Sequence, residues 1–166
     1  TTGTWSGNSY TENGVTFACE FDNIGLCIKV TTSGTASANT FFQPNTISVI
    51  GWTGYRTTGC PTGGSANNYE LMLASNNVKA HDYGTGASYT PSEDEDLVLQ
   101  IAIRSGQNAS GLVFTPMVRL STEADDTWMP YENICPISGH TGAEVTRTGK
   151  NLFDKSSVMD GYVLEI

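Results

Sequence analysis

Two groups of side chains in this sequence have the types and the spacing needed for ligand chemistry. The first is acidic: Glu123, Asp125 and Asp126 lie close together in one segment. Carboxylate oxygens grouped in a flexible loop suit Ca²⁺, so these residues are a candidate calcium site. The spacing of an EF-hand loop is absent, however, and we favour the alternative that the segment is a solvated acidic loop.

The second group is aromatic. Trp52 and Tyr55 occur in the segment GWTGYR, and Tyr83 and Tyr89 occur in DYGTGASY. An exposed indole or phenol ring can stack on the apolar face of a pyranose, so these four residues form a candidate carbohydrate-binding set. For Trp52 we favour a place in the core, because a sandwich of this size needs large side chains at its centre. Whether Tyr55, Tyr83 and Tyr89 are exposed stays open.

Catalytic chemistry has little support in the sequence. Glu70 and Asp82 are a candidate carboxylate pair, and His81 or His140 could serve as a base, but no spacing selects any of them. The sequence also lacks a nucleophile elbow and an HExxH motif. We therefore expect no enzymatic activity.

The charge balance limits the partners. The chain of 166 residues has a formal net charge of -9, and its eight basic residues are dispersed, so it offers no basic patch for a phosphate backbone. No apolar run is long enough to cross a bilayer. Nucleic acid and membrane are therefore not expected as partners. The acidic run SEDED, at 92–96, is interpreted as a solubilising segment that protects the next strand from edge pairing.

Four cysteines are present, and they lack the CxxC spacing of a zinc site. Cys19 and Cys27 flank the turn-like segment FDNIG at equal distances from Asn23, so a hairpin could bring them together and permit a disulfide. We favour buried free thiols, because the geometry of such a bridge is demanding.

The elements that must position these residues are β-strands. VTFACEF and LCIKVTTSG surround a Gly-containing turn, which predicts an antiparallel hairpin. In LVLQIAIRSG the residues Leu97, Leu99, Ile101 and Ile103 alternate with Val98, Gln100, Ala102 and Arg104, as in a half-buried strand. Further strands are predicted at 46–55, 69–77 and 111–120, and a long loop at 56–68.

Pro116 lies in the middle of the last predicted strand, GLVFTPMVRL. Proline cannot donate to a strand ladder, so this strand should lie at a sheet edge or contain a bulge. No segment has the apolar spacing of a helix. The fold class predicted is therefore all-β, an antiparallel β-sandwich of the jelly-roll type with an extended C-terminal segment.

Three regions are predicted along the chain. Residues 1–132 form the β-sandwich module, and the turn-rich residues 133–150 form a connector. Residues 151–166 resume an apolar pattern but are too few to bury a core of their own. They are either the start of a further element or a strand that packs on a neighbouring chain.

Several segments together resemble a known family. In order, these are NGVTF, TTSGTASANTFF, TGCPTGGSANNYELML, IAIRSG, VFTPMVRLS and DDTWMPYE, followed by NICPISGHTGAEVTRTGKNLFD. The set is similar to a jelly-roll, carbohydrate-binding-like module of tail, fibre and baseplate proteins from phages and prophages of Gram-positive gut bacteria. The sequence departs from that pattern in its first hairpin, where FDNIGL with Cys19 and Cys27 replaces a short Asp-Gly turn.

The resemblance implies a non-enzymatic structural module in the virion tail, or otherwise extracellular, that acts in host-surface adhesion or as a spacer. Its partners would be a bacterial surface glycan, bound weakly at many copies, and other tail proteins or copies of itself in a homo-oligomer such as a trimer. Residues 113–120 would be the last strand and 121–132 the exit.

Two alternatives remain. The chain could be a carbohydrate-binding accessory domain of a secreted bacterial hydrolase, in which case oxidation of Cys19 and Cys27 to a disulfide is expected. It could also be a pure scaffold, which would self-associate tightly and bind no glycan.

Overall fold

The structure is a computed structural model that describes residues 3–22 and 25–128. These residues form twelve β-strands, and no helix occurs among them. All strand pairings within this part of the chain are antiparallel. The predicted all-β fold class is confirmed, whereas jelly-roll connectivity stays a prediction. The expected connector at 133–150 and the segment at 151–166 lie outside the described residues.

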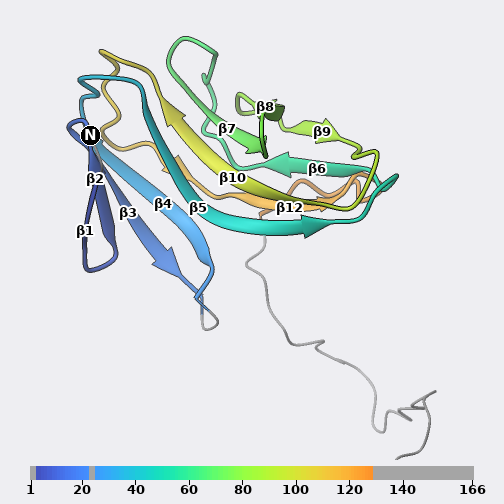
Figure 1. The fold of residues 1–166 in the computed structure, drawn as a ribbon. Coiled ribbons are helices and arrows are strands. Elements are labelled where there is room, and N and C mark those ends of the chain that lie inside the picture. Colours follow the sequence, from blue (N-terminus) through green and yellow to red (C-terminus); the bar gives the residue numbers. More distant parts are fainter. Residues whose placement is uncertain (1–2, 23–24, 129–166) are drawn as a thin grey trace, which may run out of the picture. The chain divides into compact units, whose positions relative to one another are not determined.

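The strands form three sheets (Figure 1). The first has the order β1-β2-β3-β4-β11, with bounds Thr4–Ser6, Ser9–Glu12, Val15–Phe21, Cys27–Gly34 and Val113–Phe114. The second has the order β5-β10-β7-β8, with bounds Thr40–Val49, Glu95–Ile103, Tyr69–Ala74 and Val78–Asp82. The third has the order β12-β6-β9, with bounds Met117–Leu120, Tyr55–Thr58 and Ala87–Tyr89.

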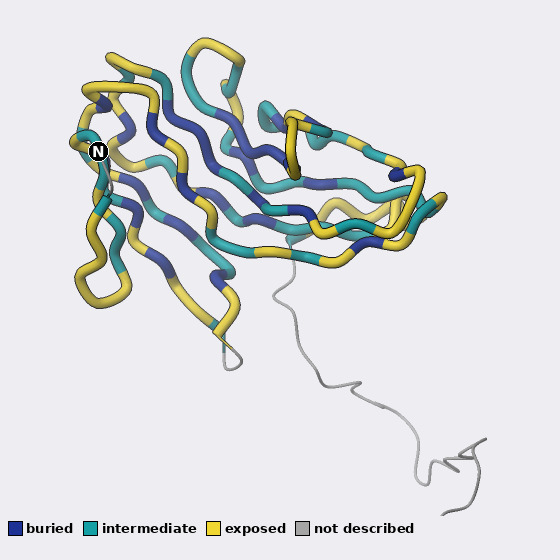
Figure 2. The backbone as a smooth tube through the Cα atoms, viewed as in Figure 1, coloured by how far each residue is buried: buried dark blue, intermediate teal, exposed yellow. Residues whose placement is uncertain are grey.

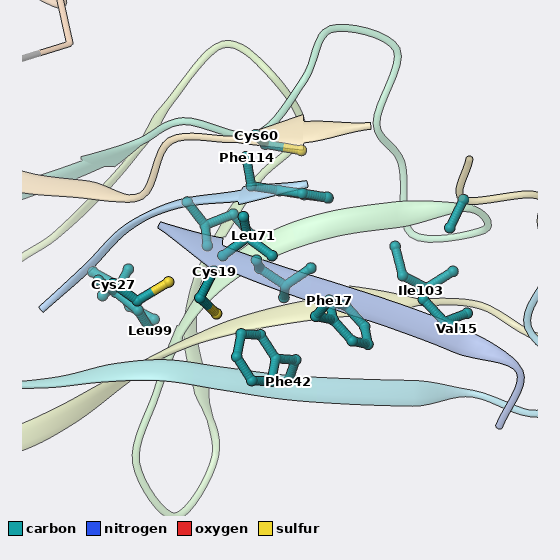
Figure 3. Packing of buried hydrophobic residues seen from close by; sticks show 14 of the residues in the cluster. Val15, Phe17, Cys19, Cys27, Phe42, Cys60, Leu71, Leu99, Ile103 and Phe114 are labelled. Carbon is teal, nitrogen blue, oxygen red and sulfur yellow. The ribbon is translucent and has the colours of Figure 1, made fainter. Parts of the chain in front are cut away.

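The hydrophobic core lies between the first two sheets (Figure 3). Phe17 of β3 stacks on Phe42 of β5, with ring centroids 4.9 Å apart, so one ring from each sheet meets at the centre. Burying each such side chain stabilises the fold by about 1.5–3 kcal/mol. Figure 2 shows that buried positions alternate with less buried ones along β3 and that the last residues of β10 are buried.

The alternation predicted for β10 is confirmed. Leu97, Leu99, Ile101 and Ile103 all belong to the buried core cluster. Of the residues on the opposite face, Val98, Gln100 and Arg104 are half-buried, whereas Ala102 is buried. We call this opposite face of the second sheet, which is turned away from the core, the outer face.

Pro116 separates two short strands, as its missing amide requires. The residues before it form β11 at the edge of the first sheet, and the residues after it form β12 at the edge of the third sheet. At this switch the amide of Thr115 donates to the carbonyl oxygen of Gly59 at 2.9 Å. The prediction that this strand lies at a sheet edge is confirmed.

The segment 46–55 differs from the prediction of one continuous strand. β5 begins earlier, at Thr40, and ends at Val49, and a turn separates it from β6. The first residues of the predicted loop 56–68 belong to β6. Glycines at 51 and 54 interrupt the strand, and the chain reverses direction between them.

The predicted hairpin of Cys19 and Cys27 is confirmed as β3 and β4. Both thiols are free and buried, and their side chains enter the core from neighbouring strands (Figure 3). A hydrogen bond from the Cys27 thiol lowers the pKa of Cys19, and the same contact, together with burial, raises the pKa of Cys27. The thiols are therefore neighbours without being bonded.

Candidate functional site

The turn between β5 and β6 carries the most exposed large apolar side chains of the described residues. Trp52 is 82% exposed and Ile50 is 65% exposed. Trp52 also has a φ of 61°, in the left-handed region that bulky side chains rarely adopt. This conformation costs about 1–2 kcal/mol, so the indole is held in solvent against the local preference of the backbone. We call residues 50–53 the Trp52 turn.

Three hydrogen bonds hold the Trp52 turn. The amide of Trp52 donates to the carbonyl oxygen of Pro91 at 2.7 Å. The amide of Gly51 donates to Asp94 Oδ1 at 2.8 Å, and the amide of Ile50 donates to the hydroxyl oxygen of Tyr55 at 2.9 Å. The turn is therefore tied to the β9–β10 connection, and both lie at the same end of the module (Figure 1).

Gly51 allows the two segments to approach each other. A Cβ atom at this position would lie 2.7 Å from the Cα atom of Glu93, closer than such atoms come in proteins. Any side chain here would push the β9–β10 connection away from the turn. The glycine thus has a packing role beside Trp52.

A surface cavity of about 330 Å³ adjoins the Trp52 turn. Three acidic residues and the end of β5 line it. One oxygen of Asp96 accepts a hydrogen bond of 2.6 Å from the Ser48 hydroxyl, and a carboxylate has about four acceptor positions, so acceptors remain for a ligand. The lining residues are Ser48, Val49, Ile50, Asp94, Glu95 and Asp96.

Tyr55 and Tyr89, from the third sheet, form hydrogen bonds with residues of this site. They are register partners in the β6–β9 pair, and both are half-buried against the core. The Tyr89 hydroxyl donates to Glu95 Oε1 at 2.5 Å. This hydrogen bond is the main cause that raises the pKa of Tyr89 and lowers the pKa of Glu95. Tyr83 is placed elsewhere: it follows β8 and stacks on His81, with centroids 5.9 Å apart.

The expectation that Trp52 lies in the core was therefore wrong. The centre of the sandwich is filled by Phe17, Phe42 and Phe114, which leaves no need for an indole. The sequence signal that could have shown this is the pair of glycines around Trp52, because they mark a turn. The role of Asp94 was also missed: this residue of the SEDED run holds the turn through Gly51.

The acidic exit segment is organised by arginines. Arg56 of β6 donates from Nε and Nη2 to the two carboxylate oxygens of Asp126, at 3.1 and 3.2 Å. Arg119 of β12 donates to the same carboxylate. Asp125 accepts from the Thr127 amide and hydroxyl, which lowers its pKa, and Glu123 is exposed.

No group of three His, Cys, Asp or Glu side chains arranged to hold a metal ion occurs in residues 3–22 and 25–128. The Asp126 carboxylate already has two cationic partners. Among the same residues, no helix is long and apolar enough to span a membrane.

The candidate carboxylate pair of Glu70 and Asp82 serves two separate networks. Glu70 binds His81 and Arg104. Asp82 accepts hydrogen bonds from the backbone amides of Cys60, Gly84 and Gly86 and so holds two loops together. Beside Asp82, burial raises the pKa of Cys60 to about 12. The two carboxylates share no partner.

Known proteins offer no guide to this site. No family model matches the chain, and no curated protein or solved structure is significantly similar to it. The function must be argued from the site itself.

Proposed function

We propose that this chain is a non-enzymatic adhesion module of a phage tail-associated protein, of the fibre or baseplate kind, that binds glycans on the surface of a Gram-positive host. The observation that carries the proposal is the exposed indole of Trp52 on a turn with a positive φ. Backbone strain of this kind persists only where the surrounding structure enforces it, and it concentrates at binding sites.

The Trp52 turn suits a sugar for a physical reason. The indole offers a flat apolar face for the C–H face of a pyranose ring. Because hydrogen bonds to Pro91, Asp94 and Tyr55 already fix the turn, little conformational entropy is lost when a ligand binds.

The cavity supplies the polar part of recognition. Sugar hydroxyls are donors, and the acidic residues Asp94, Glu95 and Asp96, which line the cavity next to the Trp52 turn, are acceptors. An aromatic platform with a few convergent polar groups is the usual composition of a small-ligand site. The carboxylates favour neutral or cationic sugars over anionic ones.

Weak binding at one turn is enough for adhesion if many copies act together. Linking sites on one particle raises overall avidity by about 10²–10⁴ without new contacts. A symmetric homo-oligomer, such as the trimer expected from the sequence resemblance, would present several Trp52 turns together.

The experiment is a pull-down of the chain on isolated wall polysaccharides from Gram-positive cells. Trp52→Ala should lose retention, while Trp5→Ala, which removes another exposed tryptophan at 56% exposure, should keep it. Thermal melting of both variants verifies that they are folded. Equal retention of wild type and Trp52→Ala would contradict the proposal, and no retention of any folded form would favour a scaffold.

One observation favours a second candidate, an accessory carbohydrate-binding domain of a secreted hydrolase. Cys19 and Cys27 are neighbouring buried thiols that an oxidising compartment would join. Thiol titration of denatured protein from its natural source separates the two candidates. Four free thiols, matching the four cysteines of the chain, favour the phage protein, and two favour the secreted domain.

A further inference from the structure

A buried carboxylate lies on the outer face of the second sheet. Glu70 of β7 is 0% exposed, although its neighbour Leu71 points to the core on the other side of the strand. An isolated buried charge is strongly unfavourable, so it must be paired and hydrogen-bonded. Glu70 is the centre of a hydrogen-bond network that is separate from the Trp52 turn.

Three side chains surround Glu70. His81 Nδ1 lies 2.6 Å from Glu70 Oε2, and Arg104 donates from Nη2 to Glu70 Oε1. Tyr83 also contacts Glu70. Burial is the main cause that raises the pKa of Tyr83, and the charge of Glu70 and a hydrogen bond to Glu70 raise this pKa further. We call Glu70, His81, Tyr83 and Arg104 the Glu70 network.

The network presents the Arg104 guanidinium and the His81 ring to solvent. Nδ1 of His81 is engaged by Glu70 at 2.6 Å, so Nε2 is the ring nitrogen left for a ligand. The side chain of His81 is 46% exposed and that of Arg104 is 24% exposed, whereas that of Glu70 is 0% exposed. In a chain of net charge -9, this face buries the Glu70 carboxylate and exposes the Arg104 guanidinium.

Aromatic rings stand at both ends of the network. Phe41 of β5 is the register partner of Ala102, which in turn is the partner of Glu70. Because Leu71 pairs with Asp82, Tyr83, the residue that follows β8, is level with Glu70. We call Phe41, Ala102, Glu70 and Tyr83 the row. It spans the width of the second sheet, so three interstrand spacings place Phe41 and Tyr83 about 14 Å apart.

The side chains along the row are packed and leave no opening into the sheet. The Arg104 guanidinium lies over the Phe41 ring, 5.8 Å from its centroid, and Phe41 is 40% exposed. Between the two rings, Ala102 and Glu70 are both 0% exposed, so the surface between the rings is closed. A ligand would lie across the row without entering the sheet.

We propose that this row is a second binding site, specific for an anionic sugar, a ring that carries a carboxylate or a phosphate. A guanidinium held by a carboxylate keeps donors for an anion in a fixed orientation, and the flanking rings fit the apolar faces of a saccharide. The exposed Arg104 guanidinium is complementary to an acid, whereas the cavity next to the Trp52 turn is lined by acidic residues. This site does not depend on the function proposed for the Trp52 turn.

The test is calorimetry of the whole chain with three oligosaccharide-sized probes. These are a glucuronic acid oligomer, a glycerol phosphate oligomer and a neutral glucose oligomer. At least one anionic probe should bind about tenfold or more tightly than the neutral probe, the gain expected when hydrogen bonds involve charged groups. Binding of the uronate alone or of the phosphate alone identifies which acid the site takes.

Variants locate the site on the row. Phe41→Ala and His81→Gln should each weaken the anionic probe, and the double variant Glu70→Gln with Arg104→Gln should abolish its advantage while it avoids an unpaired buried charge. Lys29→Gln, which removes a positive charge from β4 of the first sheet, is the matched control and should bind as wild type. Equal affinity for neutral and anionic probes, or row variants that bind like Lys29→Gln, would overturn the proposal.

Discussion

The amide of Trp52 donates a 2.7 Å hydrogen bond to the carbonyl oxygen of Pro91, so the β5–β6 turn is fastened to the β9–β10 connection. This bond fixes a strained, exposed indole in a turn that adjoins a cavity lined by acidic residues. Stability and binding should therefore respond differently to changes at this turn.

Trp52→Gly should bind no glycan and yet keep the stability of the fold. Glycine relieves about 1–2 kcal/mol of left-handed strain and adds roughly 1 kcal/mol of backbone entropy cost, so the two effects nearly cancel. Chemical denaturation measures the free energy of unfolding. A loss well above about 1 kcal/mol would mean that the indole packs on the protein, because truncation of an exposed side chain is nearly neutral.

Tyr89→Phe should raise the pKa of Glu95. The Tyr89 hydroxyl is the main cause that lowers this pKa in the folded state, with a smaller contribution from Lys79. A carboxyl with a lowered folded pKa contributes stability that is complete above its unfolded pKa, about 4.3, and is lost as the pH falls through the folded value. NMR titration of the Glu95 carboxyl in both proteins measures the change, and an identical pKa in the variant would be evidence against this role.

Asp126→Asn should loosen the exit segment with little effect on global stability. Its side chain is 51% exposed, so the loss of the pairs with Arg56 and Arg119 should cost no more than about 1 kcal/mol. Hydrogen exchange of residues 121–128 should become faster. Asp125→Asn, which leaves both arginine contacts in place, is the control and should change exchange less.

Calcium should not raise the melting temperature of the wild-type protein, because the Asp126 carboxylate is already bound by two guanidinium groups. A clear rise on addition of Ca²⁺ that Asp126→Asn removes would restore the calcium interpretation of this segment.

Phe17→Ala should cost about 3–5 kcal/mol of unfolding free energy, the usual cost of such a truncation in a packed core. Phe17 is 0% exposed and stacks on Phe42. Phe21→Ala, in the same strand but 39% exposed, is the matched control and should cost much less. Similar losses in both variants would contradict the position of the core.

The sequence predicts the parts of this fold that depend on local rules. The period of two from Leu97 to Ile103 predicts both the strand and its buried face, and Pro116 predicts a sheet edge. Asn13 and Gly14 both have positive φ, at 48° and 83°, as in a hairpin turn. This Asn-Gly pair was a usable signal for β2 that the strand prediction did not apply.

The remaining parts depend on tertiary contacts. Nothing near Asp126 in sequence indicates Arg56, which reaches it from 70 residues away. The glycines around Trp52 indicate a turn, but the contact that fastens this turn, the Trp52 amide on the Pro91 carbonyl oxygen, comes from a segment distant in the sequence. The sequence around Glu70 does not indicate its partners, because His81 comes from β8 and Arg104 follows the end of β10.

The most direct test of the account is an NMR titration of the indole N–H signals with wall polysaccharide from Gram-positive cells. The account predicts that the Trp52 indole signal shifts or broadens as polysaccharide is added, while the Trp5 signal, on β1 of the first sheet, does not move. An unchanged Trp52 signal with polysaccharide that the chain demonstrably binds would contradict the central claim that this turn is the adhesive site.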